Sequence, residues 1–461
     1  MKTINRRSFL KAGAAMTAGS VVLPEFFIGK AGAAANSKLN IAMIGCGNIA
    51  SMALDGCNSE NIVALCDVDS NMLFKYAKKY PQIKQAKTFT DFHVMLHKMG
   101  NEIDAVCVST PDHTHFAATM ASMEHGKHVF TQKPLTHNIW QARTLRKAMH
   151  KYKVITNMGN QGHTYGGIRR LREWYEADVF GQISEAHSWI DGPTWNGGYF
   201  PRKMSFPLSV DPVPAGLDYD LWLGPNAKTP YHKNYHPKTW RGFNQFGTGT
   251  LGDWFCHVAD APVWLLDLYE PVSIEAEETT GGNEFIAHDS VRIRYDFVNR
   301  GTKIPCTFYW HNGPKNTPKS IPDLKEKWGL TRDLPQYGTL YKGEKGVAYT
   351  NHRSDEARFF NNDQMRELNK LKLPEKYPRV EGGPVKEFVR AVKGEGPKPG
   401  SNFDYAAPMT EVMLLGVIAA RHGGKIEWDA KNMKITNRPE LNADLNEPVR
   451  KGWEYGKDLW S

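Results

Sequence analysis

The sequence predicts an α/β protein, with an N-terminal doubly wound parallel sheet and a C-terminal α+β domain containing a large, mostly antiparallel open sheet. Three observations predict this fold class. Strand-like and helix-like segments alternate from Leu39 to Asn157, the pattern of a parallel sheet with crossover helices. A glycine-rich turn directly follows the first of these strands. Beyond residue 158, successive strand-like segments lack intervening helices, which favours antiparallel pairing.

Length and composition describe an ordinary folded protein with more than one domain. The chain has 461 residues, and a typical domain has about 150. Its residues are 41% hydrophobic and 23% charged, which excludes a disordered chain, a collagen-like fibre and a polytopic membrane protein. The net charge of +9 is spread without a basic block, so nucleic acid is not an expected partner.

Residues 1–35 are predicted to be an export signal. A basic stretch precedes a short run of small and apolar residues, Ala12–Val22, and small-residue cleavage sites follow. Arg6-Arg7-Ser8-Phe9-Leu10-Lys11 resembles the twin-arginine signal, with Asn5 where Ser or Thr is usual. The alternative is a Sec signal with a chance arginine pair. The twin-arginine reading predicts the export machinery as a partner, a periplasmic location and no stable membrane insertion.

The six cysteines indicate buried thiols rather than a disulfide framework. They contain no C-x-x-C pair. Cys66 and Cys107 end apolar, strand-like runs and are predicted to be buried. An exported chain without evident disulfides fits a protein that folds in the reducing cytoplasm before export.

The first strand leads into a dinucleotide-binding turn. Leu39–Ile44 precedes Gly45-Cys46-Gly47-Asn48-Ile49-Ala50, the G-x-G-x-x-A form of the Rossmann fingerprint. Gly45 permits the tight turn, and Gly47 lets a pyrophosphate approach the backbone. Asn48 and Ile49 lead into the helix whose N-terminus attracts phosphate.

Asp67 predicts the kind of dinucleotide. It ends the second strand, Asn61–Cys66, and lies twenty residues after Gly47. At that position a carboxylate accepts hydrogen bonds from the ribose diol and repels a 2′-phosphate. We therefore expect NAD as the cofactor and regard NADP as disfavoured.

The first domain, 36–157, is completed by further alternating segments. We expect helices over 70–80, from after the 109–115 segment to His125 and over 138–151, and strands over 103–108, 128–131 and 154–157. Ligands bind beyond the carboxyl ends of strands in such sheets. Thr110, Pro111 and Lys133 lie at those ends, together with Gly45 and Asp67.

The second domain, 158–461, begins where the periodicity changes. We expect helices over 166–177, 384–392 and 405–421, strands over 183–190, 272–277, 290–297 and 304–310, and an exposed loop over 313–337. Trp195 and Tyr199 lie in a glycine-rich loop after the first of these strands. They either stack on a sugar face and bind substrate or belong to a packed surface loop.

Asp253 and His257 are the candidate acid–base residues. They lie four residues apart in a helical stretch after a glycine-rich run, and so on one helix face. Hydride transfer from an alcohol requires a base for the hydroxyl proton, and His257 is the natural candidate. Asp253 either orients His257 or binds an adjacent hydroxyl. Lys133 is placed to stabilise developing alkoxide charge.

Two further interpretations concern neighbouring residues. Arg241 either binds substrate or braces the loop before the glycine run. A metal site at Asp253, Cys256, His257 and Asp260 is disfavoured, because Cys256 and His257 are adjacent on a helix and point apart. We therefore expect no metal.

The chain resembles the glucose–fructose oxidoreductase / inositol dehydrogenase (Gfo/Idh/MocA) family over roughly residues 38–430. The resemblance is carried by Gly45-x-Gly47, Thr110-Pro111 with His115, Lys133-Pro134 and Asp253-x-x-x-His257. It implies that Lys133, Asp253 and His257 are catalytic and that His115 lines the nicotinamide site or caps its helix. Gln132 stands where the family has Glu, which removes one negative charge from beside Lys133.

Together these features predict an exported NAD-dependent oxidoreductase that acts on a sugar, polyol or glycoside and holds its cofactor tightly. The periplasm should hold little free NAD, so the cofactor should be loaded before export and regenerated in place. One alternative is an NAD-dependent glycoside hydrolase that oxidises its sugar transiently. Another is a non-catalytic sugar binder. The resemblance also implies a dimer or tetramer.

The signal interpretation predicts the effect of replacing both arginines. Arg6→Lys combined with Arg7→Lys should leave the precursor in the cytoplasm, because the twin-arginine pathway reads the arginine pair itself. Immunoblotting of periplasmic and cytoplasmic fractions measures this. Normal export of the double variant through the Sec route would show that the signal was misread.

Overall fold

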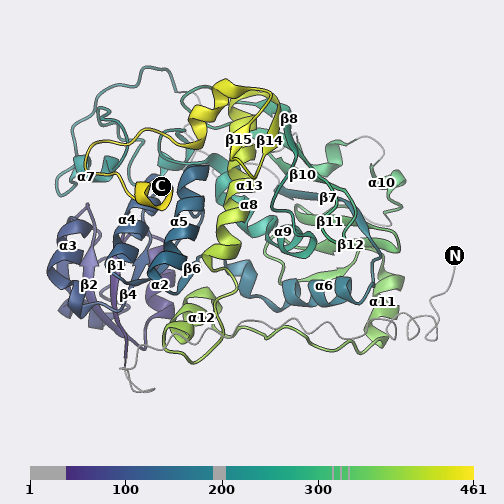
Figure 1. The fold of residues 1–461 in the computed structure, drawn as a ribbon, viewed down its shortest axis with the longest axis horizontal. Helices are drawn as coiled ribbons and strands as arrows, with labels where there is room; N and C mark the ends of the chain where they lie inside the picture. The colour runs from purple at the N-terminus through teal and green to yellow at the C-terminus, as the bar shows by residue number, and fades with distance from the viewer. Residues whose placement is uncertain (1–37, 191–203, 314–315, 322–323, 331–332) are drawn as a thin grey trace. The chain divides into compact units, whose positions relative to one another are not determined.

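The structure, a computed structural model, describes residues 38–190, 204–313, 316–321, 324–330 and 333–461. The predicted export signal and the loop with Trp195 and Tyr199 lie outside these ranges, so both interpretations stay predictions. The described residues belong to one compact unit that contains two sheets (Figure 1).

The first sheet is the predicted doubly wound Rossmann sheet. Its six strands are all parallel, in the order β3-β2-β1-β4-β5-β6. The order reverses between β1 and β4, which opens a ligand crevice beyond their carboxyl ends. The elements are β1 (Asn40–Ile44), α2 (Ala50–Gly56), β2 (Asn61–Cys66), β3 (Lys87–Phe89), α3 (Phe92–Met99), β4 (Ala105–Val108), α4 (Asp112–Glu124), β5 (His128–Thr131), α5 (Ile139–Tyr152) and β6 (Thr156–Met158).

The helix expected over residues 70–80 is wrong. The segment is a series of turns in which amides mostly bond to the carbonyl three residues earlier, as from Met72 to Asp69. Its first amides are taken up elsewhere, since Ser70 donates to Gly216 O and Asn71 donates to the Asp69 carboxylate. A helical ladder therefore does not start. Periodicity alone did not reveal these competing partners.

The second sheet has nine strands in the order β13-β12-β11-β7-β10-β9-β8-β14-β15. Only β7 and β10 pair in parallel, so the expectation of a mostly antiparallel sheet is confirmed. Its strands are β7 (Ile183–Ile190), β8 (Ser273–Thr280), β9 (Ser290–Phe297), β10 (Cys306–Asn312), β11 (Tyr337–Gly343), β12 (Gly346–Thr350), β13 (Ala357–Phe359), β14 (Gly424–Asp429) and β15 (Lys434–Ile435).

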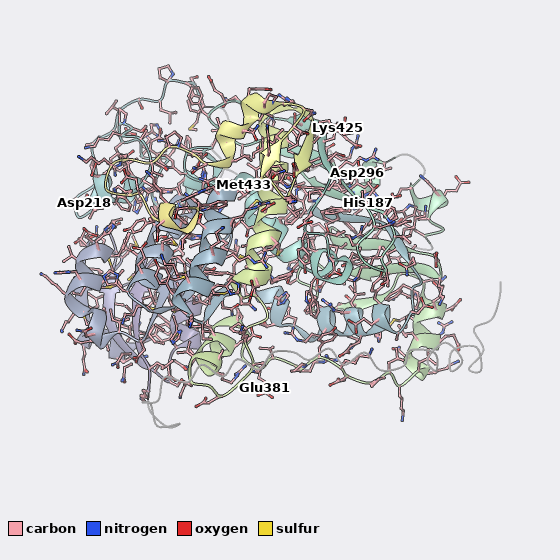
Figure 2. All side chains as sticks on the ribbon, viewed as in Figure 1. His187, Asp218, Asp296, Glu381, Lys425 and Met433 are labelled. Carbon is pink, nitrogen blue, oxygen red and sulfur yellow. The ribbon has the colours of Figure 1, made fainter. Side chains whose placement is uncertain are left out.

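The segment 313–337 is only partly the exposed loop that its composition predicts. Its described part contains a short 3₁₀ turn, η5 (Pro318–Ser320), and a short helix, α10 (Leu324–Lys327). Leu324, Trp328 and Leu330 are buried against the second sheet in a small apolar cluster. Figure 2 labels His187 and Asp296, which lie on β7 and β9 of that sheet.

Two helices from the second part of the chain pack against the first sheet and its helices. α13 (Phe403–His422) packs on α5 and β6 on one side and on α8 (Gly249–Val258) and β8 on the other (Figure 1). α12 (Gly383–Val392) contributes Val385 and Phe388 to the core of the first sheet. The remaining elements are η3 (Gln161–Thr164), α6 (Gly166–Glu176), α7 (Tyr219–Leu223), η4 (Thr239–Gly242), α9 (Asp260–Leu266), α11 (Asn362–Lys370), η6 (Pro439–Leu445) and η7 (Lys457–Leu459), besides η1 (Pro81–Gln85) and η2 (Gly100–Glu102).

α13 is the one helix in the described ranges that is long and apolar enough to cross a membrane. Within its apolar window, 83% is buried inside the structure, as in the core helix of a folded protein. All six cysteines are buried free thiols, which confirms the burial predicted for Cys66 and Cys107.

Close packing between α13 and β9 predicts an overpacking effect. A methyl group at Gly416 would overlap the hydroxyl of Tyr295, which is fully buried and has no hydrogen-bond partner among the residues described. Gly416→Ala should therefore destabilise the protein by about 1–3 kcal/mol. Calorimetric melting of the cofactor-free protein measures this.

Tyr295→Phe provides the matching control, because it removes the hydroxyl without emptying the core. The Gly416→Ala, Tyr295→Phe double variant should recover part of the lost stability. If the two changes instead destabilise additively, the proposed overlap does not explain the effect.

Candidate active site

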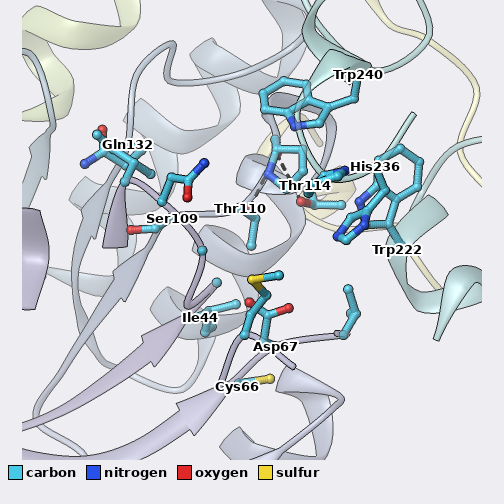
Figure 3. Close-up of a pocket in the computed structure, with 18 of the residues that line it drawn as sticks. Ile44, Cys66, Asp67, Ser109, Thr110, Thr114, Gln132, Trp222, His236 and Trp240 are labelled. Atoms are coloured by element: carbon cyan, nitrogen blue, oxygen red, sulfur yellow. Dashed lines mark hydrogen bonds between the residues drawn. The ribbon is translucent and has the colours of Figure 1, made fainter. Parts of the chain in front are cut away.

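A cavity of about 440 Å³ lies at the carboxyl ends of β1, β2, β4 and β5 (Figure 3). It contains eight of the predicted cofactor-binding residues and two further predicted residues from the second part of the chain. These are Gly45, Gly47, Asn48, Ile49, Asp67, Thr110, Pro111, Lys133, Arg241 and Asp253.

The two glycines leave the room that a pyrophosphate needs. Gly45 has φ +85°, and a Cβ there would lie 2.7 Å from the carbonyl carbon and oxygen of Ser109. Only glycine therefore fits this turn. A Cβ at Gly47 would meet no atom within 4 Å, so the space above it is open toward the cavity. This cradle fits the dinucleotide that the motif predicts.

Asp67 is held at the end of β2 by two backbone amides. Cys46 N donates to Oδ2 at 2.7 Å, and Asp69 N donates to Oδ1 at 2.9 Å. Burial raises the pKa of the Asp67 carboxyl to about 6, although these hydrogen bonds act in the opposite direction. Lys75 lines the same end of the cavity and donates to Asn48 Oδ1 at 2.5 Å.

Lys133 and Asp253 form a buried ion pair between the two halves of the site. Lys133 follows β5, and Asp253 lies in α8. Lys133 Nζ donates to Asp253 Oδ1 at 2.5 Å and to the Asp253 carbonyl at 3.0 Å. The two side chains are only 13% and 8% exposed. The chain thus brings together two of the three residues predicted to be catalytic, 120 residues apart in sequence.

Arg241 extends this pair into a network of four charges. Its guanidinium lies 3.3 Å from Asp253 Oδ1 and donates to both oxygens of the buried Asp112, at 3.0 and 3.2 Å. Thr248 also donates to Asp112. The guanidinium stacks over the Trp240 ring at 4.4 Å. Arg241 thus ties α4 to α8 and also lines the cavity, so both interpretations, bracing and substrate binding, stay predictions.

The network fixes the ionisation of Asp253. Burial alone would raise the pKa of this carboxyl, but Arg241 and Lys133 outweigh burial and hold the pKa below its ordinary value. Asp253 is therefore a carboxylate at neutral pH. It accepts hydrogen bonds from Lys133, so the interpretation that it orients His257 has no geometric support in the described residues.

His257 lies one turn beyond Asp253 on α8, buried beside Trp254 with ring centroids 5.7 Å apart. It is not among the residues that line the cavity in the described ranges, and its Nδ1 has no hydrogen-bond partner there. Burial, followed by the charge of Lys133, holds the pKa of His257 well below its ordinary value. The imidazole is therefore neutral, whereas the chemistry predicted a pKa near neutrality.

His115 has a different environment from the one expected. Its ring is buried between the carbonyl oxygens of Pro134, 2.7 Å from Nδ1, and Thr110, 2.8 Å from Nε2. It ties the Thr110 turn to the Lys133-Pro134 turn behind the cavity, and it is absent from the cavity lining over the described ranges. Burial lowers the pKa of His115.

The side chains of the disfavoured metal site make separate contacts. The Asp260 carboxylate faces away from the cavity, where it accepts hydrogen bonds from Tyr405 and contacts His163 Nδ1 at 2.9 Å. Cys256 Sγ contacts the Asp253 carbonyl at 3.8 Å. These side chains serve separate structural contacts.

Gln132, which replaces the family glutamate, lines the cavity beside Lys133 (Figure 3). Its side chain is buried, and its Nε2 has no partner among the residues that the structure describes. Gly159 leaves the space that it occupies, since a Cβ there would lie 2.7 Å from Gln132 Oε1. A neutral side chain therefore stands beside Lys133 at the position where the resemblance implies a carboxylate.

Four side chains that line the cavity from the second part of the chain, and which we call its roof, were not predicted from the sequence. Residues 204–247, which we call the cap segment, contribute Trp222, His236 and Trp240 (Figure 3). Trp453 joins them from the far C-terminus. None of the four carries a local sequence signal, because only the tertiary fold brings them to the cavity.

Two sequence models of the Gfo/Idh/MocA oxidoreductase family match the chain. The model described as oxidoreductase family, NAD-binding Rossmann fold, matches residues 39–160. The model described as oxidoreductase family, C-terminal alpha/beta domain, matches residues 185–306. Together they cover just over half of the chain, and the chain belongs to this family.

Solved structures share this fold. The WlbA dehydrogenase from Chromobacterium violaceum, in complex with NADH and UDP-GlcNAcA, is 17% identical, with a TM-score of 0.58 over 86% of this chain and 97% of that chain. An inositol dehydrogenase homologue from Azotobacter vinelandii, in complex with NADH and myo-inositol, is 14% identical, with a TM-score of 0.56 over 85% and 98%.

Similarity to curated relatives is more local. A 2,7-anhydro-N-acetylneuraminate hydratase from Mediterraneibacter gnavus is 25% identical over 91 residues, which are 20% of this chain and 24% of that protein. The chain spans less than half the length of the curated relatives that it matches.

Asp67 predicts how pH affects cofactor binding. A carboxyl with a pKa of about 6 is charged above that pH and protonated below it. Lowering the pH from about 8 to about 5 should therefore weaken NAD binding, because the ribose diol loses a charged acceptor. Calorimetric titration of the cofactor-free protein measures the affinity.

The Asp67→Asn variant is the control. It should bind NAD more weakly at pH 8, by about 1–3 kcal/mol, and its affinity should change little between the two pH values. If the variant keeps the pH dependence of the wild type, a group other than Asp67 causes it.

Proposed function

We propose that this protein is an NAD-dependent oxidoreductase that oxidises or reduces a hydroxyl-bearing carbon of a sugar, polyol or glycoside, with tightly held cofactor. The observation that carries the proposal is the Lys133–Asp253 pair in the same cavity as the Gly45–Gly47 cradle and Asp67. When bound, NAD would accept or supply hydride at its nicotinamide ring. The dehydrogenase neighbours bind sugar-related compounds together with NADH, which supports the substrate class.

Lys133 is proposed to stabilise the reacting oxygen. Its ammonium group is fixed by Asp253, so it is oriented before substrate arrives and needs little reorganisation during the reaction. A substrate oxygen that develops negative charge next to this largely buried ammonium group would be stabilised. Asp253 keeps the charge on Lys133 compensated in the absence of substrate.

His257 is the proposed acceptor of the hydroxyl proton. Its neutral imidazole is the form that accepts a proton, and its place on α8 is one turn from Asp253. It lies outside the cavity lining over the described ranges, whereas Lys133 belongs to that lining. The two residues are therefore tested separately below.

The cap segment is proposed to bind the substrate. Trp222 and Trp240 present aromatic surface to the cavity, and Arg241 also lines it. Aromatic walls with a few polar groups suit a ligand that has both C–H faces and hydroxyls. Trp195 and Tyr199 are retained as proposed substrate-binding residues of the neighbouring loop.

NAD is proposed over NADP because the Asp67 carboxylate stands where a 2′-phosphate would lie. Tight retention is supported by backbone hydrogen bonds that hold the cap segment to the rim of the cofactor site. Asp218, labelled in Figure 2, donates from its amide to Val68 O at 2.8 Å, and Ser70 donates to Gly216 O at 2.9 Å. Release of a dinucleotide would require this contact to open.

Tight retention agrees with the proposed cellular setting. We propose that the twin-arginine machinery exports the folded protein to the periplasm with NAD already bound. All six cysteines are free in the fold, so no disulfide has to form after export. We also propose a dimer or tetramer formed through the outer face of the nine-stranded sheet, which carries half-exposed polar side chains such as Arg292 and Arg294.

The function is tested by offering a panel of sugars, polyols and glycosides to the NAD-loaded protein and following bound NADH by absorbance. Lys133→Met should slow reduction about 10²–10⁴-fold, because the developing charge on the oxygen loses its stabilising cation. His257→Ala should slow it by a similar factor, the usual contribution of a positioned base, with NAD affinity little changed. Lys98→Met, an exposed lysine on α3, is the matched control.

Three outcomes separate the alternatives. A His257→Ala variant with full activity would remove His257 from the reaction. Release of p-nitrophenol from glycosides without an added acceptor would favour the redox-assisted hydrolase. No change in bound cofactor across the panel would favour a sugar binder.

A further inference from the structure

The last sixteen residues of the chain cross back to the cofactor site. Residues 446–461, which we call the C-terminal tail, follow η6 and lie against the Rossmann helices and the cap segment (Figure 1, yellow). The proposed function uses none of these residues, but one of them, Trp453, lines the cavity.

One anchor fixes the tail to the cap segment. Arg450 N donates to Pro225 O at 2.9 Å, and the guanidinium donates to Asp220 Oδ1 at 2.7 Å and to the carbonyls of Asp220 and Gly224. The Arg450 side chain is 15% exposed. It therefore joins the tail to α7, whose Trp222 forms part of the cavity roof.

A second anchor fixes the tail to α5. Trp460 Nε1 donates to Thr144 Oγ1 at 2.9 Å, its ring stacks on Trp140 at 6.0 Å, and Lys147 Nζ lies 4.5 Å above it. The residues between Arg450 and Trp460 are thus held at both ends, and Trp453 lies between the anchors.

Trp453 is positioned at the Asp67 side of the cavity. It lines the cavity with Thr90, Asp91 and Phe92, which follow β3, the strand next to β2. Its ring meets the Phe92 ring edge-on at 5.9 Å and the His93 ring at 5.1 Å. Because Asp67 marks the adenosine ribose, the space beyond it toward β3 is the place for the adenine ring.

We propose that the C-terminal tail completes the NAD site: Trp453 contacts the adenine ring, and the anchors at Arg450 and Trp460 hold it there. The proposal rests on the proposed use of NAD. The roof over the dinucleotide then consists of two segments far apart in sequence, residues 204–247 and 446–461, tied together by Arg450. Dissociation of NAD requires both segments to move.

The test measures exchange of isotope-labelled NAD from the full-length loaded protein into excess unlabelled NAD. Trp453→Ala should speed exchange about 5- to 150-fold, the range that one base–aromatic contact contributes. Trp453→Phe should restore most of the retention. Arg450→Ala keeps Trp453 but frees its anchor, and should also speed exchange. Arg438→Ala, whose guanidinium bonds to the Gly423 carbonyl outside the tail, should leave exchange unchanged.

Fragments of the cofactor locate the contact. Titration of the cofactor-free protein should show that Trp453→Ala weakens binding of ADP-ribose but not of nicotinamide mononucleotide. If wild type binds NAD and both Trp453→Ala and Arg450→Ala exchange it at the wild-type rate, the tail plays no part in retention and the proposed function stands. If wild type binds no NAD, both proposals fail.

Discussion

The buried ion pair between Lys133 and Asp253 is the contact on which the site depends. The two charges come from different halves of the structure. Lys133 follows a strand of the Rossmann sheet, and Asp253 lies on a helix beside the antiparallel sheet. A buried charge without its partner costs about 3–5 kcal/mol, so the two parts of the chain are stable together only in an arrangement that keeps the pair closed. Arg241 and the fully buried Asp112 add a second ion pair with the same constraint. The charge arrangement that would act on a substrate oxygen is thus also what joins the two halves.

The packing of the two halves of the chain against each other also explains why residues of the second half line the cofactor site. The first sheet supplies an open crevice, as any doubly wound sheet does at the point where its strand order reverses. The cap segment contributes Trp222, His236 and Trp240 to the lining of the cavity in that crevice, and the C-terminal tail contributes Trp453. A protein that leaves the cytoplasm with its only NAD would benefit from contacts that slow release of the cofactor, which links the proposed export to these residues.

The sequence predicted what depends on local pattern and did not predict what depends on tertiary partners. The spacing of Gly45, Gly47 and Asp67, together with the alternation of strands and helices, was enough to predict the doubly wound parallel sheet. The helix over 70–80 failed because Ser70 and Asn71 give their amides to partners that periodicity does not show. Asp112 and Trp453 carry no motif, and their importance appears only when residues more than 100 positions away are brought beside them. His257 was predicted to be catalytic from its spacing to Asp253, but its burial beside Trp254 was not predicted.

This fold is proposed to carry its own NAD in the cavity below the cap segment and the tail. Mass spectrometry of the nucleotide released on denaturing protein purified from the periplasm tests this claim. NAD or NADH is expected in a stoichiometric amount. Release of NADP would contradict the selectivity assigned to Asp67. Nucleotide-free protein that also fails to bind added NAD would contradict the claim itself.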